Sequence, residues 1–223
     1  MPAKRRKGKS RAVLPLLRGR KKRKVPKVLK SVAKRNNDPK ATTDAHERKK
    51  DFLDEGEMIR LLEAAKKNRH GVRDYLLLMM MWKHGLRASE ATNMERGAIN
   101  LKRGRLWVER LKKSLSLEHP IGGEELRAIK RYLATRTDNL KWLFINERGT
   151  PLTRQAVQYI VKQAAQRAKL QAHPHTLRHS CGYYMANEGV DLRTIQDYLG
   201  HRDPKHTMHY TRIAGSRFEG VWK

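Results

Sequence analysis

The sequence predicts a mainly α-helical domain that carries one small antiparallel β-sheet, an α+β fold. Three observations indicate it. From Asp51 onward, apolar residues recur three and four positions apart, which is the period of an amphipathic helix. Residues 104–121 instead alternate apolar and polar side chains, as the two strands of a hairpin do. No internal repeat is visible, so a single domain is expected rather than a repeat array.

The first 50 residues differ from the rest in charge. They hold 20 Lys and Arg against 3 Asp and Glu, a net of +17 out of the chain's +29. With few aromatic residues and little apolar periodicity, such a segment cannot bury enough surface to offset the entropy lost on ordering. We expect residues 1–50 to be a solvated, disordered tail that tracks DNA without sequence preference. A short helix at Val25–Ala33 is an alternative for part of it.

Folded structure is expected to begin near Asp51. Asp54 and Glu57 form the pattern of a capping box ahead of an apolar run, which predicts a helix start. A helix rich in Leu and Met is expected over Val72–His84, and a short one follows in "RASEATNM" at residues 87–94.

The hairpin comes next, as "RLWVER" at residues 105–110 and "SLSLEHP" at residues 114–120. The rest of the folded chain is helical in pattern. The expected helices are Leu126–Leu133, Thr153–Lys169, Thr176–Asn187 and Asp191–Leu199, with Thr153 and Asp191 as N-caps and with Gly189 and Gly200 as stops.

Composition narrows the class of function. A net charge of +29 favours polyanionic partners, and nucleic acid is the obvious one because neutralised phosphates release counterions. Cys181 is the single cysteine, which excludes an intrachain disulfide and a cysteine-based zinc site and suits an intracellular compartment. No apolar run is long enough for a signal peptide or a membrane span, so we expect a soluble protein that uses no membrane.

Three histidines and an arginine crowd into "HPHTLRHS" at residues 173–180. His175 and His179 stand four apart, as zinc ligands on a helix can, but Thr176 occupies the position where a zincin carries its glutamate. Taken singly, each histidine is an ordinary surface or core residue. Arg178 lies on the same helical face as His175, and its planar fork matches phosphate oxygens, whereas it would repel a metal ion. The cluster therefore favours a phosphate site, and no metal is expected.

The segment "HTLRHSCGYYMANEGVDLRTIQDYLGHRDPKHTMHYTR" resembles the C-terminal signature of the tyrosine site-specific recombinases. That signature is His-x-x-Arg, then Leu-Gly-His, then a tyrosine nine residues later. In this chain the pattern falls on His175, Arg178, His201 and Tyr210.

Two upstream motifs extend the resemblance. "HGLRASE" resembles the first arginine box of the family and carries over Arg87, with Glu90 as its supporting carboxylate. "RLKKSLSLEHPI" resembles the hairpin with the catalytic lysine, where Pro120 sets the register and selects Lys112, with Lys113 as the alternative. The match runs from about Asp51 to the end. It implies the recombinase catalytic-domain fold over residues 51–223.

The resemblance is strongest to the short recombinases that invert the promoter switch of bacterial fimbrial genes. It implies an enzyme that cuts and rejoins DNA through a covalent 3′-phosphotyrosine, without metal or nucleotide cofactor. The implied partners are double-stranded DNA with inverted repeats, three further copies of the chain in a homotetramer, and accessory DNA-bending proteins, in the bacterial cytoplasm. The long basic N-terminus departs from these relatives and leaves the identity of the target open.

The resemblance also implies a role for each site residue. Arg87 and Arg178 would grip the non-bridging phosphate oxygens, and Tyr210 would be the nucleophile. His175 would accept the tyrosine proton, His201 would bind the phosphate, and Lys112 would protonate the departing 5′-oxygen, with His179 in a supporting role. The alternatives are a non-catalytic DNA-binding regulator on the same fold, a relaxing topoisomerase, and an integrase or transposase of the same chemistry.

Overall fold

The computed structural model describes residues 51–111 and 115–213, all of which belong to one compact unit. The basic segment 1–50 and both candidate lysines, Lys112 and Lys113, lie outside these ranges. In chain order the elements are α2 (Glu55–Lys66), α3 (Gly71–Lys83), α4 (Ala88–Thr92), the 3-10 helix η2 (Arg96–Ala98), β1 (Ile99–Asn100), β2 (Arg105–Val108), β3 (Leu117–Pro120), α5 (Gly123–Ala134), α6 (Arg154–Ala168), α7 (Pro174–Asn187), α8 (Leu192–Leu199) and α9 (Lys205–Ile213).

Capping contacts confirm three of the predicted helix starts, those of α2, α6 and α8, whereas α5 begins at Gly123 instead of Leu126 and α7 at Pro174 instead of Thr176. The Asp54 carboxylate accepts from the Glu57 N–H at 2.8 Å, and the Glu57 carboxylate accepts from the Asp54 N–H at 3.0 Å, which completes the capping box of α2. Thr153 caps α6 through the Ala156 N–H. Helix α8 begins after the N-cap Asp191 and ends at Gly200, whose φ of 66° a residue with a Cβ rarely adopts.

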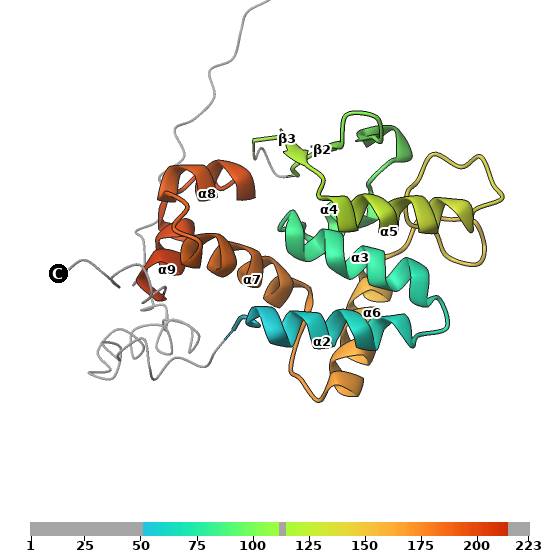
Figure 1. Ribbon diagram of the computed structural model, residues 1–223, viewed down its shortest axis with the longest axis horizontal. Helices are drawn as coiled ribbons and strands as arrows, with labels where there is room; N and C mark the ends of the chain where they lie inside the picture. Colours follow the sequence, from blue (N-terminus) through green and yellow to red (C-terminus); the bar gives the residue numbers. More distant parts are fainter. Residues whose placement is uncertain (1–50, 112–114, 214–223) are drawn as a thin grey trace, which may run out of the picture. The chain divides into compact units, whose positions relative to one another are not determined.

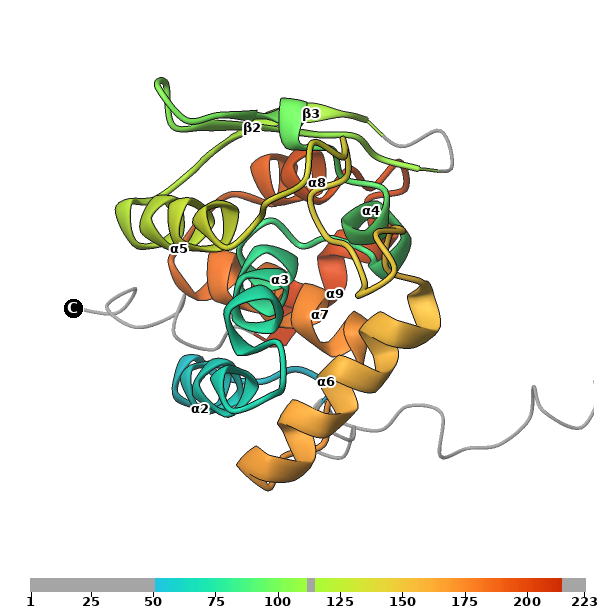
Figure 2. The same cartoon turned by 90° about the vertical axis from the view of Figure 1, so that its right-hand side faces the viewer.

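The sheet has the strand order β1-β2-β3 and is antiparallel throughout. The predicted hairpin is confirmed, since Arg105 pairs with Pro120 and Val108 pairs with Leu117. Strand β1 was not predicted because two residues are too few to show a period. Figure 2 shows the sheet as a layer over one end of the helices, with α5 and α8 beneath it.

Most of the core lies between α2, α3, α5, α6 and the sheet. Helix α3 buries a run of six side chains, Leu76 to Met81, because helices pack on several sides of it. In Figure 1, α2, α3 and α5 lie side by side, while α7, α8 and α9 form a group at one end of them. Within the described residues, no helix is long and apolar enough to span a bilayer.

The C-terminal helices α7, α8 and α9 enclose a second, smaller apolar cluster that includes Cys181 and Tyr210. Burial raises the pKa of the Cys181 thiol to about 12, which agrees with the packed rather than reactive cysteine that was expected. The sequence analysis expected no helix after Leu199, and so none at residues 205–213. These residues form a helix that packs on α7 and α8, and Tyr210 on it is only 3% exposed.

Candidate active site

The centre of the site is a buried carboxylate. Glu90 stands in the first turn of α4, and its side chain is 1% exposed. One oxygen accepts from the Arg87 backbone N–H at 2.9 Å and from Arg110 at 2.8 Å, and the other accepts from the Arg87 guanidinium at 2.5 Å. Burial alone would raise the pKa of Glu90, but the two guanidinium groups and the backbone N–H outweigh it and lower the pKa. Glu90 is therefore an anion at neutral pH that holds Arg87 in place.

Arg178 projects from α7 into the same centre. Its guanidinium donates to the carbonyl oxygens of Gly85 and Leu199, and the Glu90 carboxylate lies 4.0 Å away. Burial, together with the nearby charges of Arg110 and Arg87, lowers the pKa of Arg178 to about 10. The group still carries its charge at neutral pH, so a cluster of like charges is held in a site where an anion would be bound tightly.

Arg110 is a buried residue of the site that the sequence analysis missed. It follows β2, and its terminal nitrogens donate to Glu90, to the carbonyls of His84 and Gly85, and to the carbonyl of Tyr198 at 2.6 Å. A signal for it was present. In a strand, alternate side chains share a face, so the buried Leu106 and Val108 place Arg110 on the inner face as well.

The Tyr210 hydroxyl is hydrogen bonded to Nδ1 of His179, at 3.1 Å. Burial raises the pKa of Tyr210 to about 12, although the nearby Arg178 opposes this. The ring lies against Gly182 of α7, where a Cβ atom would come within 2.6 Å of it. The raised pKa keeps the tyrosine protonated at neutral pH, its ring is fixed in orientation, and its hydroxyl contacts a histidine ring nitrogen.

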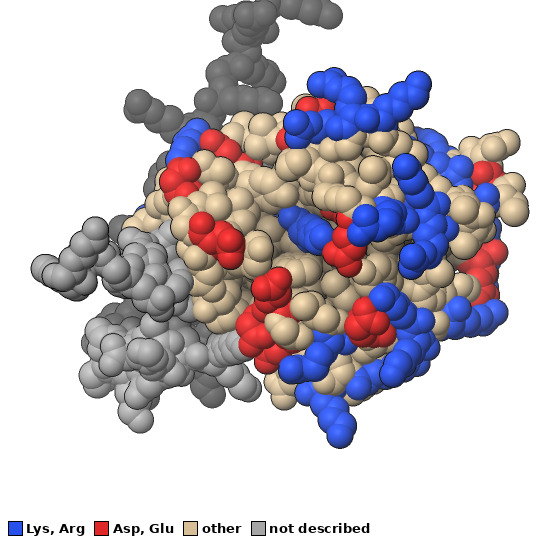
Figure 3. Space-filling view, in the orientation of Figure 1, with Lys and Arg blue, Asp and Glu red and all other residues tan. Residues whose placement is uncertain are grey.

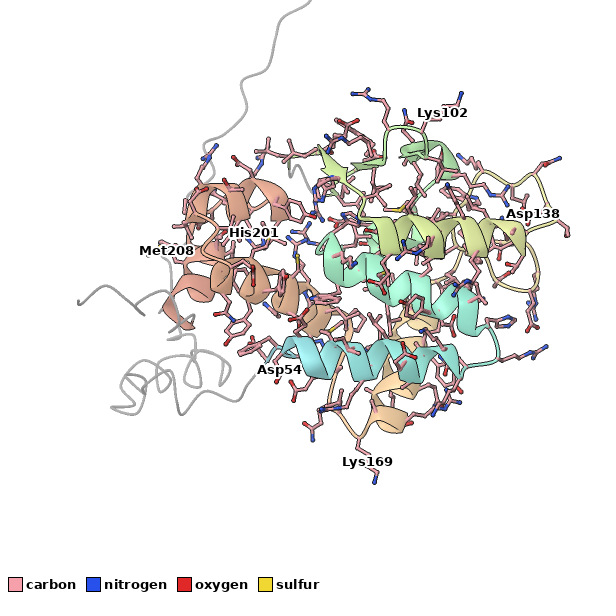
Figure 4. The ribbon with its side chains drawn as sticks, viewed as in Figure 1. Asp54, Lys102, Asp138, Lys169, His201 and Met208 are labelled. Atoms are coloured by element: carbon pink, nitrogen blue, oxygen red, sulfur yellow. The ribbon has the colours of Figure 1, made fainter. Side chains whose placement is uncertain are left out.

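The remaining histidines line the same region. His201 follows α8, its Nδ1 pairs with the Thr207 hydroxyl at 2.9 Å, and burial followed by the charge of Arg178 lowers its pKa to about 3. Figure 4 labels His201 in the group of helices formed by α7, α8 and α9. The His175 side chain is exposed, and its ring centroid lies 6.2 Å from that of His179. Partial burial, and then the charge of Arg178, lowers the pKa of His175.

The structure therefore brings seven of the eight predicted site residues into one region. These are Arg87, Glu90, His175, Arg178, His179, His201 and Tyr210. The eighth, Lys112, lies outside the described residues, although the hairpin next to it is anchored at Arg110. Residues 51–111 and 115–213 contain no group of three or more His, Cys, Asp or Glu side chains that could hold a metal ion.

A protein-family comparison decides the class. The model of the phage integrase family matches residues 51–217. The chain belongs to the phage integrase family. It is 41% identical over 184 residues to the type 1 fimbriae regulatory protein FimB of Escherichia coli K12, an alignment that covers 80% of this chain and 92% of FimB. It is 37% identical to FimE of the same strain, over 78% of this chain and 92% of FimE.

Named recombinases are also similar. The tyrosine recombinase XerA of Pyrococcus furiosus is 34% identical, over 75% of this chain and 59% of XerA. Among solved structures, a XerA recombinase superimposes with a TM-score of 0.67 at 24% identity, covering 76% of this chain and 63% of that one. A XerH recombinase bound to a palindromic difH substrate gives 0.67 at 22% identity, over 83% and 56% of the two chains. The predicted fold and enzyme class, a tyrosine recombinase, are confirmed.

Proposed function

We propose that this recombinase inverts a promoter segment between short inverted repeats in double-stranded DNA. The support is its similarity over nearly the full length of two proteins whose names describe the regulation of fimbriae. A recombinase can regulate transcription most directly by inverting the DNA segment that carries a promoter. Under this proposal the protein acts in the bacterial cytoplasm on the nucleoid, as a homotetramer that joins two sites, with the help of DNA-bending proteins.

The observation that carries the chemistry is the position of Tyr210. Its hydroxyl is bonded to His179 and lies in the field of Arg178 and Arg87. In the proposed reaction the phenol oxygen attacks the scissile phosphorus while the bond from phosphorus to the 5′-oxygen breaks. The products are a 3′-phosphotyrosine and a free 5′-hydroxyl, and attack by a second 5′-hydroxyl reverses the step. Because energy is kept in the phosphotyrosine, no nucleotide is needed.

The two arginines fit the phosphate itself. The Arg87 side chain is 24% exposed, so it can reach the non-bridging oxygens while Glu90 holds its other side. Arg178 uses one N–H of each terminal nitrogen on backbone carbonyls, and a guanidinium has five N–H groups in all. Pre-positioned cations of this kind stabilise the charge that develops on the phosphate in the transition state.

The tyrosine proton needs an acceptor in the same step, since a pKa of about 12 leaves little phenolate at neutral pH. The resemblance proposed His175 for this role. The hydrogen bond makes His179 a second candidate, and its Nδ1 can accept only in the neutral tautomer with the proton on Nε2. The proton for the leaving 5′-oxygen is proposed to come from Lys112.

Helix α6 supplies a surface that suits DNA. It contains no Asp or Glu in its 15 residues. Its exposed positions include Gln155, Gln158, Tyr159, Lys162 and Gln166, and the exposed Lys169 follows as its C-cap. Gln and Lys side chains contact base edges and phosphates. By contrast, the face shown in Figure 3 has red acidic side chains among the blue basic ones. We propose that α6 faces the DNA, which crosslinking from photoreactive bases would map.

The test begins by finding the substrate. Nicked duplexes with a randomised central region are incubated with the protein, and covalently captured DNA is recovered from a denaturing gel and sequenced. The enriched sequence is then placed as inverted repeats around a promoter on a plasmid, where inversion is scored. We expect covalent capture by the parent, none by Tyr210→Phe, and capture that persists in EDTA because the arginines supply the positive charge.

Each failure has a distinct meaning. Capture by Tyr210→Phe would assign another nucleophile. Specific binding without capture would make the protein a non-catalytic regulator. Relaxation of supercoiled DNA without inversion would indicate a topoisomerase, and excision or integration without inversion would remove the promoter-switch proposal while leaving the chemistry intact.

A further inference from the structure

Arg110 is buried, and its terminal nitrogens are fully used in hydrogen bonds to the protein, so it cannot be a phosphate ligand. Its side chain is 1% exposed, and its two terminal nitrogens already make four hydrogen bonds, two from each nitrogen. Burying a guanidinium costs free energy unless every contact is satisfied. Arg110 joins three separate parts of the chain, each of which leads into the candidate site: its guanidinium contacts the first two, and its backbone contacts the third.

The first part is the segment before Arg87. Arg110 donates to the His84 carbonyl at 2.9 Å and to the Gly85 carbonyl at 3.2 Å. Gly85 has a φ of 55°, and its carbonyl also accepts from Arg178. The carbonyl oxygen of Gly85, two residues before Arg87, therefore accepts hydrogen bonds from both guanidinium groups.

The second part is the end of α8. The last carbonyls of a helix have no partner within the helix, and positive groups are favourable there. Arg110 donates a hydrogen bond to the Tyr198 carbonyl at 2.6 Å, and Arg178 donates one to the next carbonyl, that of Leu199, also at 2.6 Å. The two guanidinium groups thus form a double bridge from Gly85 to the end of α8. His201 follows that helix end by two residues.

The third part is the hairpin. The Arg110 backbone N–H donates to the Ser116 hydroxyl at 3.0 Å, which joins the two described limbs of the hairpin. Gly200 fits against this junction so closely that a Cβ there would lie 3.0 Å from both the Arg110 side chain and the Leu115 carbonyl. The end of α8 and the base of the hairpin are therefore packed as one unit around Arg110.

We propose that Arg110 is a positioning residue of the recombination reaction, which fixes His201 relative to Arg87 by bridging Gly85 and the end of α8. It also offsets the charge of Glu90, so that Arg87 and Arg178 keep their net positive charge for the phosphate. This inference rests on the proposed strand-cleaving function. Arg110 acts through the backbone that it holds and touches no substrate.

The test is Arg110→Lys. Lysine keeps a positive charge beside Glu90, but one ammonium cannot span the carbonyls of His84 and Gly85 on one side and of Tyr198 on the other. We expect a folded protein that binds the captured DNA with unchanged affinity. Its single-turnover cleavage should fall by about 100-fold, the size expected when reacting groups are displaced by about 1 Å. A substrate with sulfur at the 5′-bridging position, whose thiolate leaves without protonation, should not restore the rate.

Two variants complete the design. Lys112→Ala should lose cleavage and regain it with the bridging sulfur, because only the leaving-group acid is missing. Arg136→Lys is the matched control, since the Arg136 side chain is also only 6% exposed, is paired with a carboxylate, Asp138, and lies outside the site. It should cleave at the parental rate. Melting temperatures of all the variants show that each is folded at the assay temperature.

The outcomes separate cleanly. An Arg110→Lys rate close to the parental one would mean that Arg110 only neutralises Glu90, and the proposal would be wrong. Rescue of Arg110→Lys by the bridging sulfur would also overturn it, because Arg110 would then act through the hairpin acid and not through α8. If the parent itself formed no covalent complex, the proposed function would fail whatever Arg110 does.

Discussion

The main core and the C-terminal helices of this domain are stabilised in different ways. The main core, between α2, α3, α5, α6 and the sheet, is apolar and large, and α3 alone contributes six fully buried side chains in sequence. The cluster among α7, α8 and α9 is small, with Cys181, Ala186, Ile195, Leu199 and Tyr210 as its buried members. The residues proposed for catalysis in α7, after α8 and in α9 therefore lie in the part with less apolar burial.

Polar contacts fix that part to the rest of the domain. Arg110 and Arg178 join it to Gly85, and the Leu53 N–H donates to the Ser180 hydroxyl at 2.8 Å. Apolar packing is not directional, whereas a hydrogen bond weakens steeply when its angle departs from the optimum. From this difference between the two regions we infer that the positions of Tyr210 and His201 depend on directional hydrogen bonds, while the stability of the fold depends mainly on the apolar core.

After loss of the nucleophile itself, the largest effect should come from removal of the hydrogen-bond partner of Tyr210, His179. If His179 accepts the proton of Tyr210, His179→Ala should lower the rate of covalent capture by about 10²–10⁴-fold, the usual contribution of a general base. His175→Ala should then have the smaller effect. Single-turnover cleavage of the captured DNA measures both rates.

His70→Ala is the matched control for this pair, because His70 pairs with Glu147 on another part of the domain. Its rate should equal that of the parent. A greater loss in His175→Ala than in His179→Ala would return the acceptor role to His175 and leave His179 with the supporting role expected from the sequence.

The second largest effect on cleavage should come from the packing of the Tyr210 ring against Gly182. In Gly182→Ala the new Cβ would lie 2.6 to 2.8 Å from three ring atoms of Tyr210, so the ring must shift. Cleavage should fall by about 100-fold while DNA affinity is unchanged, because the hydroxyl moves relative to the phosphate. Single-turnover cleavage and equilibrium binding measure the two quantities. Gly97→Ala serves as control, since a Cβ at Gly97 meets nothing within 4 Å.

If Gly182→Ala cleaved normally, the position of Tyr210 would not depend on α7. The contrast between the two regions would then be wrong, because the small cluster would tolerate repacking as an ordinary core does.

Much of the fold could be predicted because its signals are local. The capping box at Asp54 and Glu57, the caps Thr153 and Asp191, and the glycine at 200 each act within a few residues of a helix end. Helix α9 could not be predicted in this way. Its buried face contacts α7 and α8, and it includes the polar Thr207, which is buried because its hydroxyl pairs with His201.

The site could be predicted in part for a similar reason. Motif spacing pointed to Arg87, Arg178, His201 and Tyr210, and the structure places them in one region. The role of Arg110 depends on carbonyl oxygens of residues 84, 85 and 198, which are distant in sequence. Backbone acceptors leave no trace in side-chain identity, so the sequence analysis found neither Arg110 nor its double bridge with Arg178.

The smallest effect on catalysis should come from the main core. Ile129 of α5 is fully buried there. Ile129→Ala should lower the free energy of unfolding by about 2–5 kcal/mol, through lost burial and the cavity left behind. The cleavage rate per folded molecule should stay at the parental value, because none of the contacts that orient the site is changed. Chemical denaturation and active-site titration by covalent capture measure the two quantities.

If Ile129→Ala does not fold, Ile129→Val gives the same comparison at a cost of about 0.5–1.5 kcal/mol. Together with Gly182→Ala, these variants test the contrast from both sides, because the Ile129 variants should lower stability at a constant rate, whereas Gly182→Ala should lower the rate itself. A parallel fall of the cleavage rate in the Ile129 variants would mean that the core transmits strain to the site. In that case the two regions would be one cooperative unit, and the directional contacts of Arg110 and Arg178 would not be enough to hold Tyr210 and His201 in place.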